Sequence, residues 1–204
     1  MTPNASTRAL APTLWPAANR TAQEVVLVLV GTLLIPIAAK IKVPFYPVPL
    51  TLQTLAILLI AATYGLRLGT LTVLAYLLEG ALGIPVFANT PPAVAGPAYF
   101  LGPTAGFLAG FVVLAIIVGA AADRGSDRSI RRLFLAAIVG EVIMFAIGFA
   151  WLAWFANLSS GAIGLGAAKA WAGGVAPFLL GDLLKIVLVS LAVPAAWNLV
   201  GKRS

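Results

Sequence analysis

Residues 104–122 read TAGFLAGFVVLAIIVGAAA and contain no charged side chain. A helix that crosses the hydrocarbon core of a bilayer needs about 20 mainly apolar residues, so this stretch has the length and composition of one crossing. Gly106 and Gly110 lie four positions apart within it, a spacing that lets transmembrane helices pack closely. The stretch therefore predicts a membrane-spanning helix with a face of small residues.

Five further apolar segments surround it, at residues 21–39, 50–64, 70–83, 133–155 and 175–200. Together they predict an all-α, polytopic membrane protein in which six transmembrane helices form a single domain over residues 19–204. Residues 1–18 are polar and contain three prolines, and they lack the charged head and apolar run of a cleavable signal peptide. We expect a flexible N-terminal arm there.

The composition excludes most other classes of protein. Hydrophobic residues make up 61% of the chain and charged residues 9%, whereas soluble globular proteins have about 45–50% and about 25%. The chain has neither cysteine nor histidine, so it lacks disulfides and the usual ligands of zinc, copper, haem and iron–sulfur clusters. It also lacks a nucleophile–histidine pair and a Walker sequence for ATP hydrolysis. We therefore expect neither an enzyme nor a resident cofactor.

The basic residues predict the orientation in the membrane. If the N-terminus is cytoplasmic, nine basic residues fall on the inner side and three, Lys40, Lys42 and Lys169, on the outer side. Cytoplasmic loops carry the excess of Lys and Arg, so both termini are predicted to be cytoplasmic. The outer connections are then residues 40–49 and 85–103, which are rich in proline, and 156–174, which is rich in glycine. Because irregular backbone at membrane depth occurs where it lines a cavity, we expect the ligand site at the outer face.

Ionisable side chains inside the spans are the first candidates for that site, because their burial is costly. Asp182 and Lys185 stand three positions apart and therefore share one face of the last helix. They offer an acceptor and a donor to a polar ligand, or else they only neutralise each other as a structural ion pair. Glu79, near the outer end of its helix, either joins the site or faces the membrane interface. Glu141 lies nearer the cytoplasmic end and is interpreted as structural or partner-facing.

Four motifs occur in order along most of the chain: PVPLTLQTL at residues 47–55, GALGIPVFA at 80–88, FLGPTAGF at 100–107 and GDLLK at 181–185. In this order and spacing they closely resemble the BioY family, the biotin-binding S components of energy-coupling factor (ECF) transporters. The resemblance implies a six-helix fold in the prokaryotic cytoplasmic membrane and high-affinity capture of biotin from outside. It also implies a transmembrane coupling subunit and two cytoplasmic ATPase subunits as partners, and no nucleic acid.

The resemblance further implies that the vitamin lies near the outer surface, under the first and third connecting loops. Biotin presents a carboxylate, a ureido group and an apolar body, so its site needs an acceptor, donors and an apolar wall. Carried over, the candidate ligand-binding residues are Asp182, Lys185, Asn89, Gln53, Tyr99, Tyr46, Phe45 and Glu79. For docking to the coupling subunit, family members use an Ala-x-x-x-Ala pattern on the first helix, for which Ala18 and Ala22 have the spacing.

Three alternative functions stay open on the sequence alone. One is an S component of similar fold for another vitamin, against which the Asp-x-x-Lys pair and the proline-rich loop argue. Another is a membrane scaffold or sensor that does not transport. A third is a small lipid-modifying enzyme, which would need a catalytic set near the interface, whereas Glu79 and Glu141 are expected at opposite depths.

Overall fold

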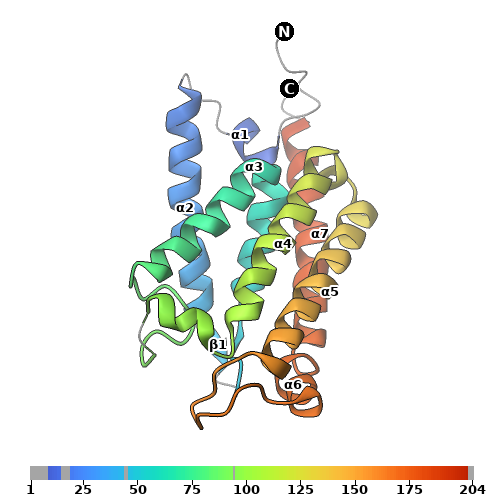
Figure 1. Cartoon of the computed structure of the whole chain (residues 1–204). Coiled ribbons are helices and arrows are strands. Elements are labelled where there is room, and N and C mark those ends of the chain that lie inside the picture. Colours follow the sequence, from blue (N-terminus) through green and yellow to red (C-terminus); the bar gives the residue numbers. More distant parts are fainter. Residues whose placement is uncertain (1–8, 15–18, 44–45, 94, 202–204) are drawn as a thin grey trace.

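The computed structural model describes residues 9–14, 19–43, 46–93 and 95–201. Its elements follow one another as α1 (Leu10–Leu14), α2 (Arg20–Lys40), β1 (Lys42–Val43), β2 (Leu50–Thr51), α3 (Gln53–Ala81), η2 (Pro97–Leu101), α4 (Ala105–Asp123), η3 (Ser126–Arg128), α5 (Ile130–Trp154), α6 (Ala167–Gly174) and α7 (Leu179–Gly201). The strands β1 and β2 pair as one short antiparallel ribbon. The fold is therefore a helical bundle, as predicted (Figure 1).

Among the described residues, five helices are long and apolar enough to cross a membrane: α2, α3, α4, α5 and α7. Most of two predicted segments, 50–64 and 70–83, belongs to the single helix α3, which is continuous across a sharp kink at Gly65. Figure 1 shows both arms of α3 extending downward from its upper end, so the chain rises along the first arm and descends along the second. The predicted pair of helices is thus present as two arms joined without a loop.

Gly65 allows this reversal because its backbone adopts φ 78° and ψ −175°, which side chains with a Cβ rarely adopt. The next residue is capped from another helix, since the Leu66 N–H donates to Asp123 Oδ2 at 3.1 Å. A Cβ at Gly119 of α4 would lie 2.8 Å from the Leu66 backbone, so the kink packs directly against α4. Backbone freedom and a cross-helix cap together reverse the chain here.

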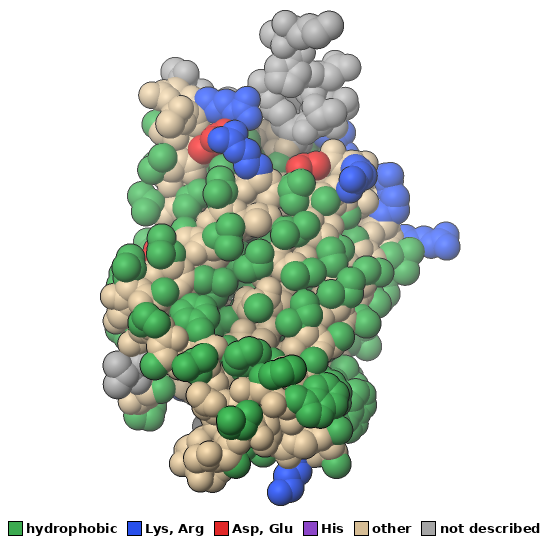
Figure 2. All heavy atoms as spheres, viewed as in Figure 1, with side chains coloured by type: hydrophobic (Ala, Val, Ile, Leu, Met, Phe, Trp, Pro, Cys, Tyr) green, Lys and Arg blue, Asp and Glu red, His purple; other side chains and the backbone are tan. Residues whose placement is uncertain are grey.

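The core lies around α4, which packs between α3 and α5. Gly110 of α4 touches α5 so closely that a Cβ would lie 2.8 Å from the Met144 side chain, and a Cβ at Gly106 would overlap Trp151. The close packing predicted from the glycine spacing is therefore confirmed. The outer surface of the bundle is largely apolar (Figure 2). Exposed aliphatic side chains of this kind are expected where the solvent is lipid.

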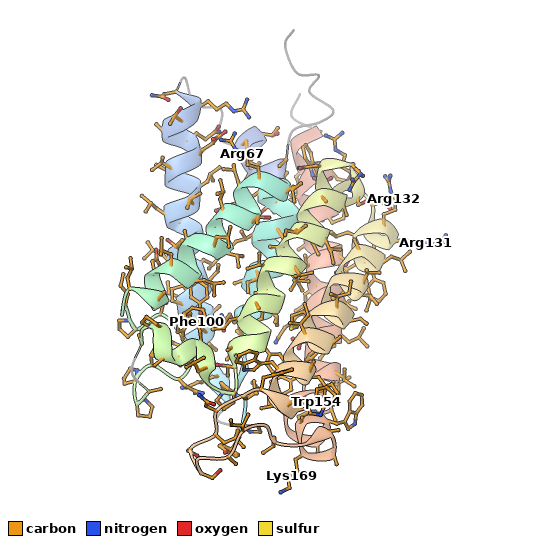
Figure 3. The ribbon with its side chains drawn as sticks, viewed as in Figure 1. Arg67, Phe100, Arg131, Arg132, Trp154 and Lys169 are labelled. Atoms are coloured by element: carbon orange, nitrogen blue, oxygen red, sulfur yellow. The ribbon has the colours of Figure 1, made fainter. Side chains whose placement is uncertain are left out.

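Charged side chains gather at one end of the bundle. Figure 2 shows most of them at its upper end, and Figure 3 places Arg67, Arg131 and Arg132 there and Lys169 at the lower end. The start of α2 and the end of α7 also lie at the upper end (Figure 1). Most of the basic side chains that were assigned to one side of the membrane thus lie at one end of the bundle. The proline-rich and glycine-rich connections lie at the other end.

Two expectations about irregular segments are corrected. Part of the predicted flexible arm is ordered, because residues 10–14 form α1, whose Leu10 is 2% exposed in the core. The Gln23 side-chain amide also donates to the Pro12 carbonyl at 3.1 Å. The rest of the arm, residues 1–8 and 15–18, lies outside the described residues. The second correction concerns the glycine-rich connection 156–174, which contains the helix α6, packed against α5.

Candidate functional site

A cavity lies at the end of the bundle opposite the basic side chains, where the first and third connections meet the starts of α3, α4 and α7. About 550 Å³ of space lies between its lining atoms, part of it open to the outside. Its lining residues are Val48, Pro49, Thr51, Gln53, Thr54, Phe87, Ala88, Tyr99, Thr104, Phe107, Leu108, Phe111, Met144, Phe145, Phe178, Asp182 and Lys185. The mixture of many apolar and few polar lining groups is typical of a small-molecule site.

The polar side of the cavity is built around an ion pair. Lys185 Nζ donates to Asp182 Oδ1 at 2.7 Å, to the Thr51 carbonyl at 2.6 Å and to Thr54 Oγ1 at 2.9 Å. An ammonium group has three N–H donors, so all three are engaged. Thr54 in turn donates its hydroxyl proton to Asp182 Oδ1 at 2.7 Å. In the described part of the chain no hydrogen bond reaches Asp182 Oδ2, which leaves one carboxylate oxygen as an acceptor.

Two helix starts bring this network together. Asp182 lies in the first turn of α7, where the positive end of the helix dipole favours a carboxylate. Thr54 lies in the first turn of α3, and Thr51 lies in β2 just before it. The ribbon therefore presents a backbone carbonyl to Lys185 at the level where α7 presents the ammonium. The sequence predicted the pair, and the fold adds two threonine partners that the sequence analysis did not identify.

A second polar contact lies beside the pair. The Gln53 side-chain amide donates to the Tyr76 hydroxyl at 2.8 Å, and both residues are buried. Gln53 lines the cavity, whereas Tyr76 lies behind it on the second arm of α3. Tyr76 was missed by the sequence analysis, although a tyrosine in the middle of an apolar span signals a buried polar contact. This hydrogen bond joins the two arms of α3 at the cavity.

Aromatic rings form much of the apolar wall. The ring of Tyr99 stacks on Phe87 at 4.6 Å between centroids, and Phe87 also meets Tyr76 edge to face at 5.5 Å. Burial raises the pKa of the Tyr99 hydroxyl, with hydrogen bonds from Thr104 and the Asn89 backbone acting in the opposite direction. The hydroxyl is therefore neutral at physiological pH. The remaining phenylalanines of the wall, Phe107, Phe111, Phe145 and Phe178, were not singled out from the sequence.

Two lysines fasten the loops above the cavity to each other. Lys40 Nζ donates to the Phe87 carbonyl at 2.7 Å and to the Thr90 carbonyl. Lys42 Nζ donates to the Ala88 carbonyl and lies 3.4 Å from Asn89 Oδ1. The two charges that the sequence placed in the first outer loop are thus bonded to the backbone of the third. They hold Phe87 and Ala88 where these residues line the cavity.

The predicted site residues divide into three groups. Asp182, Lys185, Gln53 and Tyr99 are brought together at the cavity. Three others are not lining residues: half-buried Asn89 lies in the third loop, half-buried Glu79 on α3, and Tyr46 is 68% exposed in the first loop. Phe45 lies outside the described residues.

Glu141 is neither at the surface nor partner-facing. It is 3% exposed inside the bundle, on α5. The partner-facing interpretation of this residue was therefore wrong.

Comparison with known proteins places the chain in a family. The BioY family model matches residues 8–202. The chain belongs to the BioY family. A relative from Pyrococcus horikoshii, named a probable biotin transporter BioY, is 38% identical over 164 residues, which cover 80% of this chain and 90% of the relative. The biotin transporter BioY of Thermotoga maritima is 35% identical over 160 residues, covering 78% of this chain and 87% of the relative.

A solved crystal structure shares the fold of this BioY chain. That protein is described as the S-component for biotin from an ECF-type ABC transporter. The two structures have a TM-score of 0.72 and 21% sequence identity, and the match covers 90% of this chain and 95% of the other. This BioY chain and the solved S-component therefore share an overall fold.

Proposed function

We propose that this chain captures biotin at the outer face of a prokaryotic cytoplasmic membrane and serves as the substrate-binding subunit of an ECF-type transporter. The observation that carries the proposal is the Asp182–Lys185 pair, buried at a cavity that is otherwise mostly apolar. Its relatives named as biotin transporters support the choice of vitamin.

The chemistry of the cavity matches the groups of biotin. A ureido N–H would donate to Asp182 Oδ2, the carboxylate oxygen without a partner in the described chain. An oxygen of the ligand would replace the Thr51 carbonyl as an acceptor for Lys185. The fused rings and the aliphatic tail would lie against the phenylalanine side chains and against Tyr99. Asn89, Tyr46 and Glu79 lie outside the lining of the empty cavity, so their contact with biotin requires movement of the loops or the side chains.

The proposed topology has six crossings, because each arm of α3 crosses the membrane once. Both termini are cytoplasmic in this topology, and the cavity faces outward, since the basic side chains gather at the opposite end (Figure 3). The chain would deliver biotin with a transmembrane coupling subunit and two ATPases. Of the two alanines proposed for docking, Ala22 is exposed on α2 and Ala18 lies outside the described residues.

The direct test is to purify the chain in detergent and titrate it with biotin, thiamine and riboflavin by calorimetry. We expect tight binding of biotin alone. Preference for another vitamin would reassign the substrate, and no binding of any of them would favour a scaffold or sensor. Uptake of labelled biotin by cells with and without the coupling proteins then separates assisted transport from uptake by the chain alone.

A further inference from the structure

A third carboxyl group lies inside the bundle close to the ion pair but outside its hydrogen bonds. Glu141 is near the middle of α5 and is 3% exposed. Both its oxygens are buried, and neither has a hydrogen-bond partner among the described residues. Met144 and Phe145, one turn further along α5, line the cavity. Glu141 therefore lies behind the cavity wall and outside the hydrogen-bond network of the ion pair.

The charges that reach Glu141 come from α7. Its carboxyl group interacts electrostatically with Asp182 and Lys185. The other elements packed against α5 are α4, α6 and η3. Their ionisable side chains are at the ends of the bundle: Asp123 on α4, Lys169 on α6, and Asp127 and Arg128 on η3, with Arg131 and Arg132 at the start of α5 itself. The charges that interact with Glu141 are therefore those of the Asp182–Lys185 pair.

The ion pair has no positive charge that could balance a second carboxylate. The single positive charge of Lys185 is balanced by Asp182, and its three donors go to Asp182, Thr51 and Thr54. An ionised Glu141 would add an unbalanced negative charge to an apolar interior, which is costly. It would also attract Lys185 away from the cavity. The neutral acid avoids both effects.

We propose that Glu141 is a positioning residue for biotin. As the neutral acid, Glu141 leaves Lys185 bound to Asp182 at the cavity, where the ammonium can donate to the ligand. When it is ionised, it competes with Asp182 for Lys185 and repels the carboxylate of the ligand, so biotin binds more weakly. This inference rests on the proposed function, and it makes the binding of biotin dependent on a proton held behind the site.

The sign of the pH dependence follows from this competition. A carboxyl group has an ordinary pKa of about 4, so the carboxylate of biotin is largely ionised from pH 5.5 to 9.5 and the ligand contributes little titration in that range. Affinity should fall as the pH rises and Glu141 loses its proton. The Glu141→Gln variant imitates the neutral acid at every pH and should keep its affinity. Because the two proteins differ only at residue 141, the difference between their profiles isolates Glu141.

The test is calorimetric titration of the purified protein with biotin from pH 5.5 to 9.5, in buffers of different ionisation enthalpy. We expect the wild-type affinity to fall about tenfold or more as the pH rises across this range, because a pKa that differs by one between the free and the bound protein changes the affinity tenfold. At the alkaline end of the range, binding should be accompanied by net uptake of protons. The Glu141→Gln variant should show a flat profile and no such uptake. The control, Glu24→Gln, removes a carboxylate that is paired with Arg20 and Arg67 at the far end of the bundle, and it should follow the wild type.

Identical profiles in wild type and Glu141→Gln would overturn the inference. If that variant fails to fold, the wild type still decides the question, because binding without proton uptake at any pH is incompatible with the proposal. Failure of the proposed function has a different signature, which is a wild-type protein that does not bind biotin at any pH.

Discussion

At the residue scale, the site depends on two opposite charges that are nearly removed from solvent. The side chains of Lys185 and Asp182 are 12% and 6% exposed, and they lie 2.7 Å apart. Removal of one member of a buried pair leaves the other charge uncompensated, whereas removal of both charges together costs much less. Stability and ligand binding therefore respond differently to the same set of substitutions.

For Asp182→Asn and for Lys185→Met, we expect each single change to lower the stability of the protein, by about 3–5 kcal/mol where a full charge is left unpaired. The double variant should regain most of that loss, because neither charge remains. All three proteins should bind biotin at least about 100-fold more weakly, equivalent to about 3 kcal/mol. Thermal unfolding and calorimetric titration measure the two effects. A double variant that still binds biotin at wild-type affinity would remove the pair from the site.

At the element scale, glycines determine how closely helices and loops approach the cavity. A Cβ at Gly80 of α3 would overlap the ring of Phe87, which lines the cavity and stacks on Tyr99. The Gly80 carbonyl also accepts the N–H of Gly96 at 2.8 Å, which ties the far side of the same loop to the helix. The third loop can cover the cavity as it does because Gly80, in the last turn of α3, has no side chain.

The Gly80→Ala variant should weaken the binding of biotin about tenfold, since overpacking typically costs about 1–3 kcal/mol and displaces Phe87 from the wall. The matched control is Gly181→Ala on α7, next to Asp182, where a Cβ would meet no atom within 4 Å. That variant should bind biotin normally. Equal affinity of both variants, measured by calorimetry, would show that the position of Phe87 does not matter for binding.

The kink in α3 allows a second prediction at this scale. Gly65→Ala places a Cβ on backbone at φ 78° and against the Asp123 carboxylate, so stability should fall by more than the roughly 1–3 kcal/mol of backbone strain alone. Gly125→Ala is the comparison, because Gly125 has φ 83° but no atom within 4 Å of its Cβ position. We expect the Gly65→Ala variant to unfold at a lower temperature than the Gly125→Ala variant. The opposite order would mean that the contact with Asp123 does not limit the kink.

At the scale of the whole molecule, most of the exposed charge lies at the end of the bundle opposite the cavity. Most of the visible Lys and Arg side chains lie at the upper end, the cavity lies at the other end, and an apolar belt lies between them (Figure 2). Positively charged ends of membrane proteins remain in the cytoplasm during insertion, so this asymmetry is the basis of the proposed outward-facing cavity. The proposed orientation depends on the whole bundle, because it requires that both arms of α3 cross the membrane so that the connections alternate between its sides.

Site-directed labelling tests that orientation, and the chain is suited to it because it has no cysteine of its own. Ser160→Cys changes an exposed residue between α5 and α6, and Ser126→Cys changes a residue of η3 at the basic end. A membrane-impermeant maleimide added to intact cells should label the Ser160→Cys variant alone. Permeabilised cells should allow labelling of both. Labelling of the Ser126→Cys variant in intact cells would reverse the proposed topology.

The sequence by itself determined the helical class of this protein, the approximate segments and the Asp182–Lys185 pair. Long uncharged segments must be helical in a bilayer, because their backbone groups find no other hydrogen-bond partners there. A carboxylate and an ammonium three positions apart necessarily share a helix face. Such features depend on local composition and spacing, which are visible in one dimension.

Only the tertiary structure decided which side chains line the cavity and how its loops are held. Thr54 and Lys185 are far apart in sequence, as are Gln53 and Tyr76, and they meet because α3 reverses at Gly65 and α7 returns beside its first arm. The contacts of Lys40 and Lys42 with the backbone of the third loop likewise have no signature in the sequence. Hydrogen bonds of this kind depend on the packing of distant segments, and local spacing carries no information about that packing.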